Sequence, residues 1–457
     1  MRYYSTRDKS LRMGLEQVVK MGLAPDGGLF MPERIPQLPR EFFEGIDKLS
    51  FQDIACEVAK AFFGEDVPQE ALEGIVRDTL SFDCPVQKVE EGIYALELFH
   101  GPTLAFKDVG GRFMARMLSH FGAGTGEVNV LVATSGDTGS AVANGFLGVP
   151  GIHVYVLYPK GKVSPIQECQ FTTLGQNITA LEVDGVFDDC QALVKRAFLD
   201  EELKARLTLT SANSINVARF LPQSFYYFNA YARLKALGLS DELVVSVPSG
   251  NFGNLCSGLF AKRMGLPIKR FIAANNANDV VYEYLSSGVY SPRASVQTIA
   301  NAMDVGAPSN FERILDLYGA RAAAASAMFG PDVAALATSC DAGALSTLRA
   351  LREDLSGARY SDEQIRAALR SCLERTGYQL DPHGACGYLA LRDGLHPGEC
   401  GVFLETAHPA KFTSVVADAV GAAPALPARL AAFMQGEKRS LPLPNSYAAF
   451  RAALFSR

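Results

Sequence analysis

The sequence predicts an α/β fold built on parallel sheets. Two observations carry this prediction: strand-length runs are apolar throughout, and helical patterns separate them along the chain. Strands that are apolar on both faces are typical of a parallel sheet that helices cover on both sides. The predicted strands are Val128–Ala133, Ile152–Tyr158, Ile178–Val183, Leu243–Val247, Phe271–Ala274 and Val402–Leu404, and the predicted helices are Gly139–Leu147, Phe187–Leu207 and Leu255–Met264.

The first 80 residues follow a different pattern. Proline and glycine interrupt the early part, at Pro25–Gly28, Pro32, Pro36 and Pro39. Phe51–Phe63 then places apolar residues at helical spacing. We therefore expect an N-terminal helical extension that caps the rest of the chain.

The chain is expected to divide into an N-terminal domain over residues 1–80, an α/β region over 81–430, and a C-terminal tail and helix over 431–457. The alanine-rich run Ala320–Ala337 is expected to form a peripheral helix. Scattered prolines between Ala422 and Pro444 indicate a surface excursion before a short C-terminal helix.

The composition is that of a globular protein with a large core. Of 457 residues, 48% are hydrophobic and 20% are charged, and the formal net charge is −6. This length allows about two or three domains of ordinary size. The negative total argues against general nucleic-acid binding, because a phosphate backbone favours a basic face. A local basic pocket for a small phosphate is compatible with this negative net charge.

The nine cysteines indicate whether the protein has a metal site and in which cellular compartment it lies. No two have the C-x-x-C spacing, so neither a zinc ribbon nor a redox pair is indicated. Most are expected to be small buried hydrophobic residues, which suits a reducing cytoplasm. The N-terminus lacks the apolar core of a secretory signal, and no apolar run approaches the roughly 18 residues that span a bilayer. We expect a soluble cytoplasmic protein without a membrane segment.

The stretch His100–Lys107, H-G-P-T-L-A-F-K, is the most informative in the chain. Its apolar run Leu104–Phe106 suggests that the Lys107 amine lies at a dry, structured place. A buried lysine loses some preference for its charged form and becomes a better nucleophile, as imine formation with a carbonyl cofactor requires. The alternative is a snorkelling lysine at the start of a helix.

A strand, a glycine-rich turn and a helix follow one another around Pro248–Asn254. Backbone N–H groups at the start of such a helix have no intrahelical partner and attract an anion, and glycines let the backbone approach it closely. The alternative is a tight turn with no ligand. The segment matches neither G-x-x-x-x-G-K-S/T nor G-x-G-x-x-G.

A second strand–loop–helix unit carries hydroxyls and backbone N–H groups. The strand Val128–Ala133 leads into Ser135, Gly136, Asp137 and Thr138, which suit a carboxylate or phosphate of a substrate. Asp137 could equally cap the following helix, with Ser135 and Thr138 as local turn formers. The two roles are compatible.

A polar cluster of Asn213, Ser214 and Asn216 precedes an amphipathic helix that begins near Val217. Its members could contact a substrate, and the alternative is plain helix capping. Capping is the interpretation we favour for Ser214.

Thr406 follows the strand Val402–Leu404 and so stands at a carboxyl end, where open α/β sheets bind ligands. His408 and His383 each lie beside a proline in a loop. Histidines in such places are interpreted as structural, and neither is proposed as catalytic.

Five blocks of the sequence, in order, resemble the threonine synthase family of pyridoxal-phosphate enzymes, and the likeness extends over nearly the whole chain. The blocks are His100–Lys107, Ala133–Gly139, Ser211–Asn216, Pro248–Asn254 and Thr406–Phe412. The resemblance implies the tryptophan-synthase-β-like fold, with two open parallel-sheet α/β domains, the cofactor between them, and an N-terminal extension.

The resemblance also implies roles for individual residues. Lys107 would hold pyridoxal phosphate as an imine and serve as the general base. Thr406 would hydrogen-bond the pyridine nitrogen, and the loop around Asp137 would hold the substrate's carboxylate. The cofactor phosphate would be bound by Gly250, Asn251, Phe252 and Asn254, with Gly253 shaping the turn.

The implied reaction converts O-phospho-L-homoserine and water to L-threonine and phosphate, the last step of threonine biosynthesis, by a carbon–oxygen lyase acting on phosphate. Because a dianion needs cationic partners, Arg112, Lys162 and Arg219 are candidates for the substrate's phosphate, although each could be a surface ion pair. Two alternatives stay open: a threonine or serine dehydratase, and a non-catalytic relative that binds a phosphorylated ligand or a protein partner.

Overall fold

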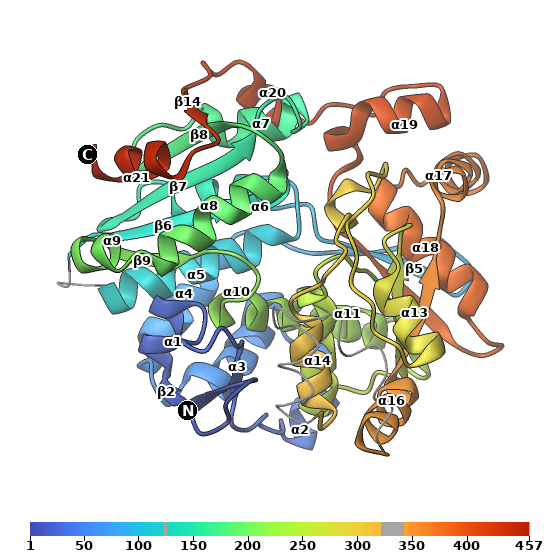
Figure 1. Ribbon diagram of the computed structural model, residues 1–457. Helices are drawn as coiled ribbons and strands as arrows, with labels where there is room; N and C mark the ends of the chain where they lie inside the picture. Colours follow the sequence, from blue (N-terminus) through green and yellow to red (C-terminus); the bar gives the residue numbers. More distant parts are fainter. Residues whose placement is uncertain (123–125, 321–341, 457) are drawn as a thin grey trace.

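The computed structural model describes residues 1–122, 126–320 and 342–456. Two sheets with parallel strands, each flanked by helices, lie side by side, and the N-terminal segment packs against both (Figure 1). The predicted α/β fold is confirmed. A helix is expected at Ala320–Ala337. All of this range except Ala320 lies outside the described residues.

The larger sheet has six strands in the order β12-β11-β10-β13-β5-β4, parallel except for the hairpin partner β4. Its two faces belong to different hydrophobic clusters: Val245 and Val402 point into one, and Val244 and Phe403 into the other. Burial on both faces explains why these strands are apolar throughout. The strands are β4 Val86–Glu90, β5 Ile93–Glu97, β10 Leu243–Pro248, β11 Arg270–Asn275, β12 Leu355–Arg359 and β13 Cys400–Glu405.

Helix α18, Pro382–Gly394, packs across β10, β11 and β13 on one face of this sheet. On the other face, Gly258 of α12 lies against Phe271 of β11. The remaining helices of this half are α11 Ser224–Ala236, α12 Gly253–Arg263, α13 Val280–Ser287, α14 Phe311–Leu317, α16 Ala342–Asp354, α17 Asp362–Thr376 and α19 Thr413–Val420, with short 3-10 turns η2 Leu221–Gln223, η3 Asn301–Met303 and η5 Pro409–Phe412.

The smaller sheet has five parallel strands in the order β14-β8-β7-β6-β9. Val130 and Val154 face the cluster shared with α5 and α6, whereas Leu131 and Tyr155 face the cluster shared with α8 and α21. The elements of this half are β6 Val128–Ala133, β7 Ile152–Pro159, β8 Ile178–Asp184, β9 Thr208–Ser211, β14 Ser440–Pro444, α5 Lys107–Gly122, α6 Asp137–Phe146, α7 Pro165–Thr172, α8 Phe187–Leu199, α9 Glu201–Arg206, α10 Val217–Phe220, α20 Ala428–Met434 and α21 Tyr447–Phe455.

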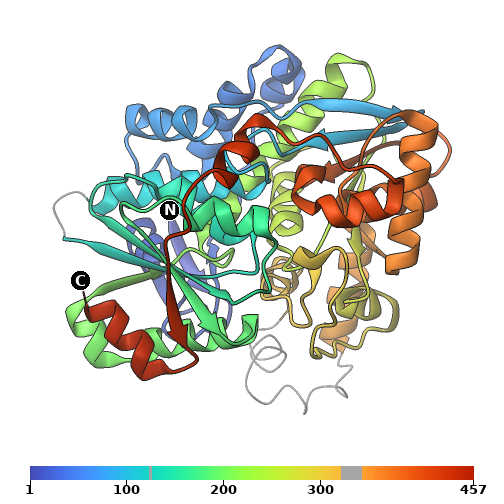
Figure 2. The same cartoon turned by 90° about the horizontal axis from the view of Figure 1, so that it is seen from above.

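Two sequence-based predictions are wrong in this half. The helix expected over Phe187–Leu207 is two helices, because Asp200 is extended and its carboxylate accepts a hydrogen bond from Leu203 N at 2.9 Å, which starts α9. The stretch expected as a surface excursion contains α20 and β14, and β14 pairs with β8 in parallel. Seen from above, the C-terminal segment crosses from the larger half to the smaller one (Figure 2).

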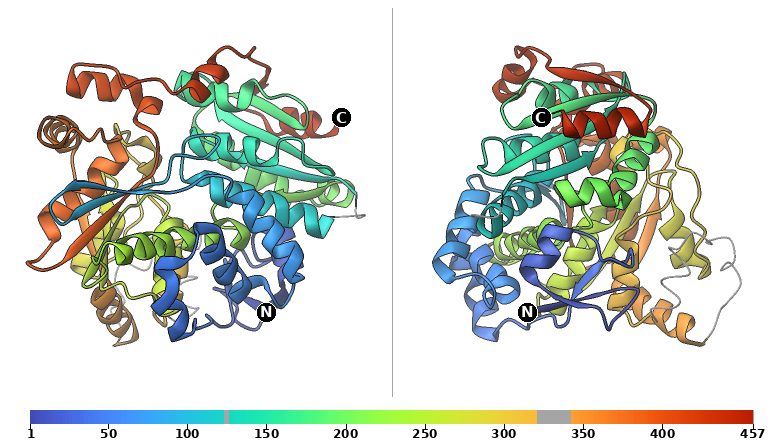
Figure 3. Two further views of the ribbon diagram at one scale, coloured as in Figure 1. Left: turned by 180° about the vertical axis from the view of Figure 1, so that it is seen from behind. Right: turned by 60° about the vertical axis from the view of Figure 1, so that its left-hand side comes forward.

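The N-terminal segment is not purely helical, which corrects another prediction. Strands β1 Arg2–Ser5, β2 Arg12–Gly14 and β3 Phe30–Pro32 form an antiparallel sheet in the order β2-β1-β3. Its helices pack on the rest of the chain: α3 contacts α11 and α4 contacts α5 (Figure 3). They are α1 Leu15–Met21, α2 Arg40–Gly45, η1 Ile46–Lys48, α3 Phe51–Phe63 and α4 Gln69–Thr79.

Two further observations concern the residues that the structure describes. None of their helices is both long enough and apolar enough to cross a membrane. Eight of the nine cysteines lie in the described ranges; all eight are unpaired, and six of them are buried. Cys340 lies outside those ranges.

Candidate functional site

The segment that carries Lys107 lies directly beside the segment that follows β13. Phe106 N donates to Thr406 O at 2.8 Å, and His408 N donates to Leu104 O at 3.1 Å. Leu104 adopts a φ of 56°, a conformation that non-glycine residues rarely hold outside functional or tightly constrained sites. The backbone thus places two of the predicted blocks next to each other.

Lys107 is the first residue of α5 and is half-buried. Its amine makes no hydrogen bond or ion pair with any residue that the structure describes, and it lies 5.5 Å from the centre of the Phe106 ring. Burial lowers the pKa of the amine, Asp137 opposes this, and the cations Arg219 and Lys411 lower it further. A lysine in these surroundings is suited to be an amine nucleophile.

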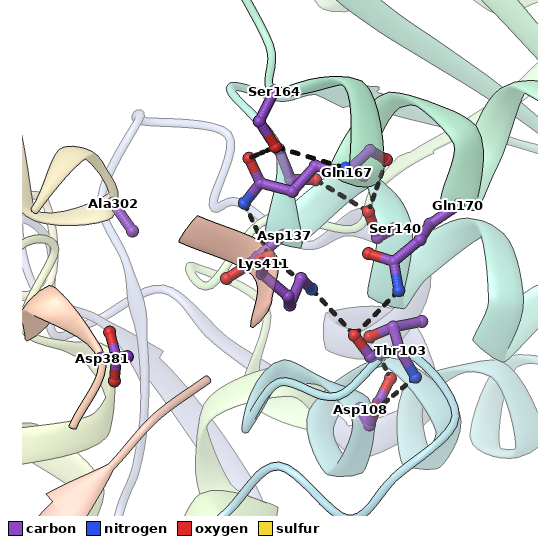
Figure 4. A network of polar contacts seen from close by, with 12 residues as sticks. Thr103, Asp108, Asp137, Ser140, Ser164, Gln167, Gln170, Ala302, Asp381 and Lys411 are labelled. Carbon is purple, nitrogen blue, oxygen red and sulfur yellow. Dashed lines mark hydrogen bonds and ion pairs between the residues drawn. The ribbon is translucent and has the colours of Figure 1, made fainter. Parts of the chain in front are cut away.

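A buried carboxylate fixes the turn before Lys107. Asp108 accepts hydrogen bonds from Thr103 N at 2.9 Å and from Thr103 Oγ1 at 2.7 Å. Burial raises the pKa of Asp108, whereas these hydrogen bonds lower it. The same Thr103 uses its carbonyl oxygen to accept from Lys411 Nζ at 2.8 Å and from Gln170 Nε2 at 2.9 Å. Thr103 therefore ties the lysine turn to two other segments (Figure 4).

Asp137 forms a buried ion pair with Lys411, with Asp137 Oδ1 2.6 Å from Lys411 Nζ. Gln167 Nε2 also donates to Asp137 Oδ1, at 2.8 Å. Burial would raise the pKa of Asp137, but the charges of Lys411 and Lys107 outweigh it and hold the pKa below its usual value. Figure 4 shows this pair beside Thr103. The residue is charged and fixed in place.

Asp137 is not the N-cap of α6, so that alternative is wrong. The N-cap is Gly136, with a φ of 150°, where a Cβ would lie 2.6 Å from the Gln167 side chain. The hydroxyls of Ser135 and Thr138 make no hydrogen bond within the described residues, and Ser135 is exposed. Thr134 Oγ1 accepts from Gly136 N at 3.0 Å and from Gly139 N at 2.8 Å, so the side-chain donors left for an anionic ligand at this helix start are the hydroxyls of Ser135 and Thr138.

The loop after β10 leads into a helix, α12, whose N-terminus is uncapped. Phe252, with a φ of 61°, is the N-cap of α12, and no side chain caps this end. Asn254 Nδ2 is buried without a hydrogen-bond partner, while Asn254 Oδ1 accepts from Tyr227 OH at 2.7 Å. A Cβ at Gly250 would lie 2.8 Å from Ala302 O. An orphaned donor, free backbone N–H groups and a required glycine all fit a bound phosphate.

The capping prediction for Ser214 is wrong, and the structure exchanges the expected roles of Ser214 and Asn216. Ser214 Oγ accepts from Asn251 Nδ2 at 2.8 Å and from Asn310 Nδ2 at 3.1 Å, so it joins the phosphate loop. Asn216 caps α10 through Ala218 N at 3.0 Å and donates to Val19 O at 2.8 Å. Both ends of the Asn216 side chain are thus engaged within the protein. The Asn213 side chain makes no hydrogen bond within the described ranges.

The three candidate cations for the substrate's phosphate lie in different surroundings. Arg219 is buried, its Nε has no partner among the described residues, and burial lowers its pKa to about 10. Arg112 instead donates to the carbonyl oxygens of Asp78 and Thr79 at the end of α4. It also pairs with the Asp78 carboxylate, which agrees with the alternative of an ion pair. Lys162 is exposed after β7. Arg219, whose charge acts on Lys107, is the one with a free donor at the site.

Thr406 is buried, and its hydroxyl makes no hydrogen bond within the described residues. The preceding Glu405 accepts from Asp381 N at 2.6 Å, and its second oxygen is buried without a partner. Burial and the charge of Asp381 raise the pKa of Glu405 well above its usual value. A carboxyl group whose surroundings favour its uncharged form therefore lies next to the residue expected at the pyridine nitrogen.

Both histidines have structural partners, as expected. His383 Nδ1 lies 2.5 Å from Asp381 Oδ1, and its Nε2 accepts from Ala302 N at 3.2 Å. His408 Nδ1 accepts from Ala410 N at 3.1 Å and so caps the turn η5. Each imidazole therefore accepts a hydrogen bond from a backbone N–H, which agrees with a structural role.

Sequence reasoning missed several residues of the site. Lys411 lies inside a block that was recognised, but nothing in the block marks it as the partner of Asp137. Gln167, Gln170 and Thr103 likewise act through contacts between distant segments. No local pattern signals such contacts.

Three family models match successive parts of the chain. They are "Threonine synthase N terminus" over residues 2–80, "Pyridoxal-phosphate dependent enzyme" over 76–327 and "Threonine synthase, C-terminal" over 384–454. Together they cover the N-terminal segment, most of both sheets and the C-terminal segment.

Individual relatives agree over the full length. The chain is 45% identical over 461 residues to the threonine synthase of Escherichia coli, covering 100% of both. It is similar to the crystal structure of threonine synthase with bound pyridoxal phosphate from Brucella melitensis, with a TM-score of 0.93, 38% identity and coverage of 99% and 98%. Against threonine synthase from yeast the TM-score is 0.89, with 32% identity and coverage of 100% and 98%.

Proposed function

The chain belongs to the threonine synthase family, and from that premise we propose that it converts O-phospho-L-homoserine and water to L-threonine and phosphate with pyridoxal phosphate as cofactor. The observation that carries the proposal is a half-buried lysine, unpaired within the described residues, whose amine is influenced by Asp137 at the N-terminus of α6, together with the uncapped N-terminus of α12. One such end suits the cofactor's phosphate, and the other suits the substrate's carboxylate.

The residues present fit this cofactor. Asn254 Nδ2 and the backbone N–H groups at the start of α12 are available to its phosphate, with Gly250 leaving room. The free Thr406 hydroxyl is available to the pyridine nitrogen, and Lys107 to the aldehyde carbon. When bound, the cofactor supplies an electron sink for negative charge that develops at the substrate's Cα.

Lys107 has the central role in proton transfer. Because burial and two neighbouring cations lower the pKa of its amine, it can accept a proton at neutral pH more readily than an exposed lysine. We assign to its Nζ the removal of the Cα proton and the later proton transfers at Cβ. Asp137 stays charged and limits how far the pKa falls.

The substrate is held at both of its anionic ends. Ser135 and Thr138 offer hydroxyl donors to the carboxylate at the start of α6, and Gly136, whose N–H donates to Thr134 Oγ1, shapes the turn that presents them. Arg219 and Asn213, each with a donor that is free within the described residues, are assigned to the departing phosphate. A guanidinium suits a phosphate dianion because it donates along two directions at once. Lys162 is retained as an outer cation, and Arg112 is assigned to the end of α4.

The direct test is to incubate the purified protein with O-phospho-L-homoserine and identify the amino-acid product by mass spectrometry. Threonine with stoichiometric phosphate supports the proposal. Turnover of L-serine or L-threonine to a keto acid, without threonine formation, would instead indicate a dehydratase. A preparation that takes up no pyridoxal phosphate would revive the non-catalytic alternative.

Two further assignments stay predictions. The division at residues 80 and 430 is retained as an expectation, although β14 places part of the last segment within the smaller sheet. A cytoplasmic location is supported by the eight unpaired cysteines of the described ranges.

A further inference from the structure

We propose that Arg313 is a positioning residue for the cofactor's phosphate: through Asn310 it aligns the loop Ser249–Phe252, and its buried charge favours a dianion there. This inference rests on the proposed function, because it takes that loop to be the phosphate site. Arg313 lies outside the five recognised blocks.

Arg313 is held in one position by four contacts. It lies on α14 and is fully buried. Its Nε donates to Phe30 O at 3.1 Å, Nη1 donates to Asn310 Oδ1 at 2.6 Å, and Nη2 donates to Ile215 O. Its guanidinium carbon lies 4.1 Å from the centre of the Phe220 ring. The side chain therefore connects the N-terminal segment, the polar cluster before α10 and α14.

No carboxylate of the described residues pairs with this guanidinium. The acidic neighbours on α14 are engaged elsewhere: Glu312 Oε1 accepts from Thr6 Oγ1 and lies 3.5 Å from Arg7 Nε, and Asp316 Oδ1 lies 2.7 Å from Lys9 Nζ. A buried charge without a counterion is costly unless an opposite charge comes close. Burial accordingly lowers the pKa of Arg313 to about 10.

Asn310 connects this charge to the phosphate loop. Its Oδ1 accepts from Arg313, which directs its Nδ2 toward Ser214 Oγ at 3.1 Å. The same Ser214 oxygen accepts from Asn251 Nδ2, and Asn251 Oδ1 accepts from Ser309 N at 2.8 Å. A Cβ at Gly253 would lie 3.3 Å from Asn310 Nδ2. Arg313 is thus separated from the uncapped start of α12 by one side chain.

The competing role for Arg313 is purely structural: it would only fasten Phe30 and the N-terminal sheet to α14. If the role is purely structural, replacing Arg313 should weaken the binding of every ligand of the site equally. The proposed role predicts a loss that depends on the cofactor's phosphate, so the comparison of pyridoxal phosphate with pyridoxal separates the two.

The experiment measures the dissociation constants of both compounds with the full-length apoprotein, by absorbance of the lysine-bound form. Arg313→Met and Asn310→Asp should each raise the constant for pyridoxal phosphate by about tenfold or more, and leave that for pyridoxal within about twofold. Asn310→Asp keeps a hydrogen-bond acceptor for Arg313 and so should fold. It removes the donor to Ser214, and its carboxylate neutralises the charge of the Arg313 guanidinium. Arg313→Lys should fall between wild type and Arg313→Met.

Arg352→Met is the matched control, because Arg352 also donates to two backbone carbonyls, those of Leu285 and Ser286, but lies on α16. Equal losses for both compounds in Asn310→Asp and Arg313→Lys, or an unchanged constant for pyridoxal phosphate, would overturn the proposal. If Arg313→Met fails to fold, those two variants decide. Failure of the wild-type protein to bind pyridoxal phosphate at all would instead refute the proposed function.

Discussion

Lys411 Nζ lies 2.6 Å from Asp137 Oδ1, and this buried ion pair joins the segment after β13 to the first turn of α6. The two residues follow strands of different sheets, β6 and β13, so the pair connects the two halves of the molecule beside Lys107. Lys411 also donates to Thr103 O in the turn before Lys107. One side chain therefore links three of the five recognised blocks.

Removing Lys411 should be far more damaging than removing a surface lysine. Lys411→Met leaves a buried carboxylate without its cation, and the expected loss of unfolding free energy is about 3–5 kcal/mol. Adding Asp137→Asn to that variant should recover much of the stability but not the activity. Denaturant unfolding of the single and double variants measures this. Lys88→Met, which removes an exposed pair with Glu91, should leave the unfolding free energy nearly unchanged. A comparable loss in Lys411→Met and Lys88→Met would contradict the account.

The two glycines of the phosphate loop should respond differently to alanine. A Cβ at Gly250 would lie 2.8 Å from both Ala302 O and Met303 Cα, whereas at Gly253 the nearest atom is Asn310 Nδ2 at 3.3 Å. Backbone atoms cannot move aside easily, so Gly250→Ala should weaken pyridoxal-phosphate binding by about tenfold or more, and Gly253→Ala by less. Equilibrium titration of the apoproteins checks the order. The reverse order would mean that the phosphate lies elsewhere.

Substitution of Arg219 should affect substrate binding, whereas substitution of Arg112 should affect stability. Arg219→Met removes a buried donor that is free within the described residues, and KM for O-phospho-L-homoserine should rise by about tenfold or more. Arg112→Met removes hydrogen bonds to the end of α4, so unfolding free energy should fall by about 1–3 kcal/mol while KM stays near wild type. Steady-state kinetics with denaturant unfolding tests both, and a large KM effect in Arg112→Met would reverse the assignment.

Glu405 should make the protein less stable as the pH rises. Burial and the charge of Asp381 raise its folded-state pKa, so above the unfolded value of about 4.3 the folded state holds a proton that the unfolded state has lost. Glu405→Gln removes that titration. Relative to wild type it should gain stability from pH 4 toward neutral pH, as unfolding at several pH values would show.

Glu399 provides the control of opposite sign. Burial would raise its pKa, but hydrogen bonds and charges from Arg270 and Lys269 lower it to about 2. The stability it contributes is therefore present above the unfolded pKa and disappears as the pH falls toward 2. Glu399→Gln should be destabilised at neutral pH and approach wild type in acid. The same pH dependence in both variants would refute these assignments.

Six strands of the two sheets could be predicted within one or two residues at each end, as at Val128–Ala133, but β5 was not predicted although it is buried on both faces. Strand β14 was missed because Pro442 and Pro444 argue against a strand. It lies at the edge of its sheet, the position where proline is tolerated. The N-terminal strands were missed because three or four residues are too few to reveal an alternating pattern.

The site could be predicted in its blocks but not in its internal contacts. Ser214 and Asn216 are both ordinary capping residues, and the sequence does not show that α10 begins at Val217 itself, which makes Asn216 its cap. The partners of Asp137 and Ser214, and the two carbonyl partners of Arg313, lie far away in the sequence. Such pairings follow from the way the sheets meet, and no local spacing encodes them.

The central claim is that Lys107, and not the nearby buried Lys411, carries the cofactor. The measurement that tests it most directly is borohydride reduction of the protein loaded with pyridoxal phosphate, followed by peptide mass spectrometry. We predict one modified peptide, with the label on Lys107, and no label together with no turnover in Lys107→Ala. A label on Lys411, or turnover that survives in Lys107→Ala, would contradict the account.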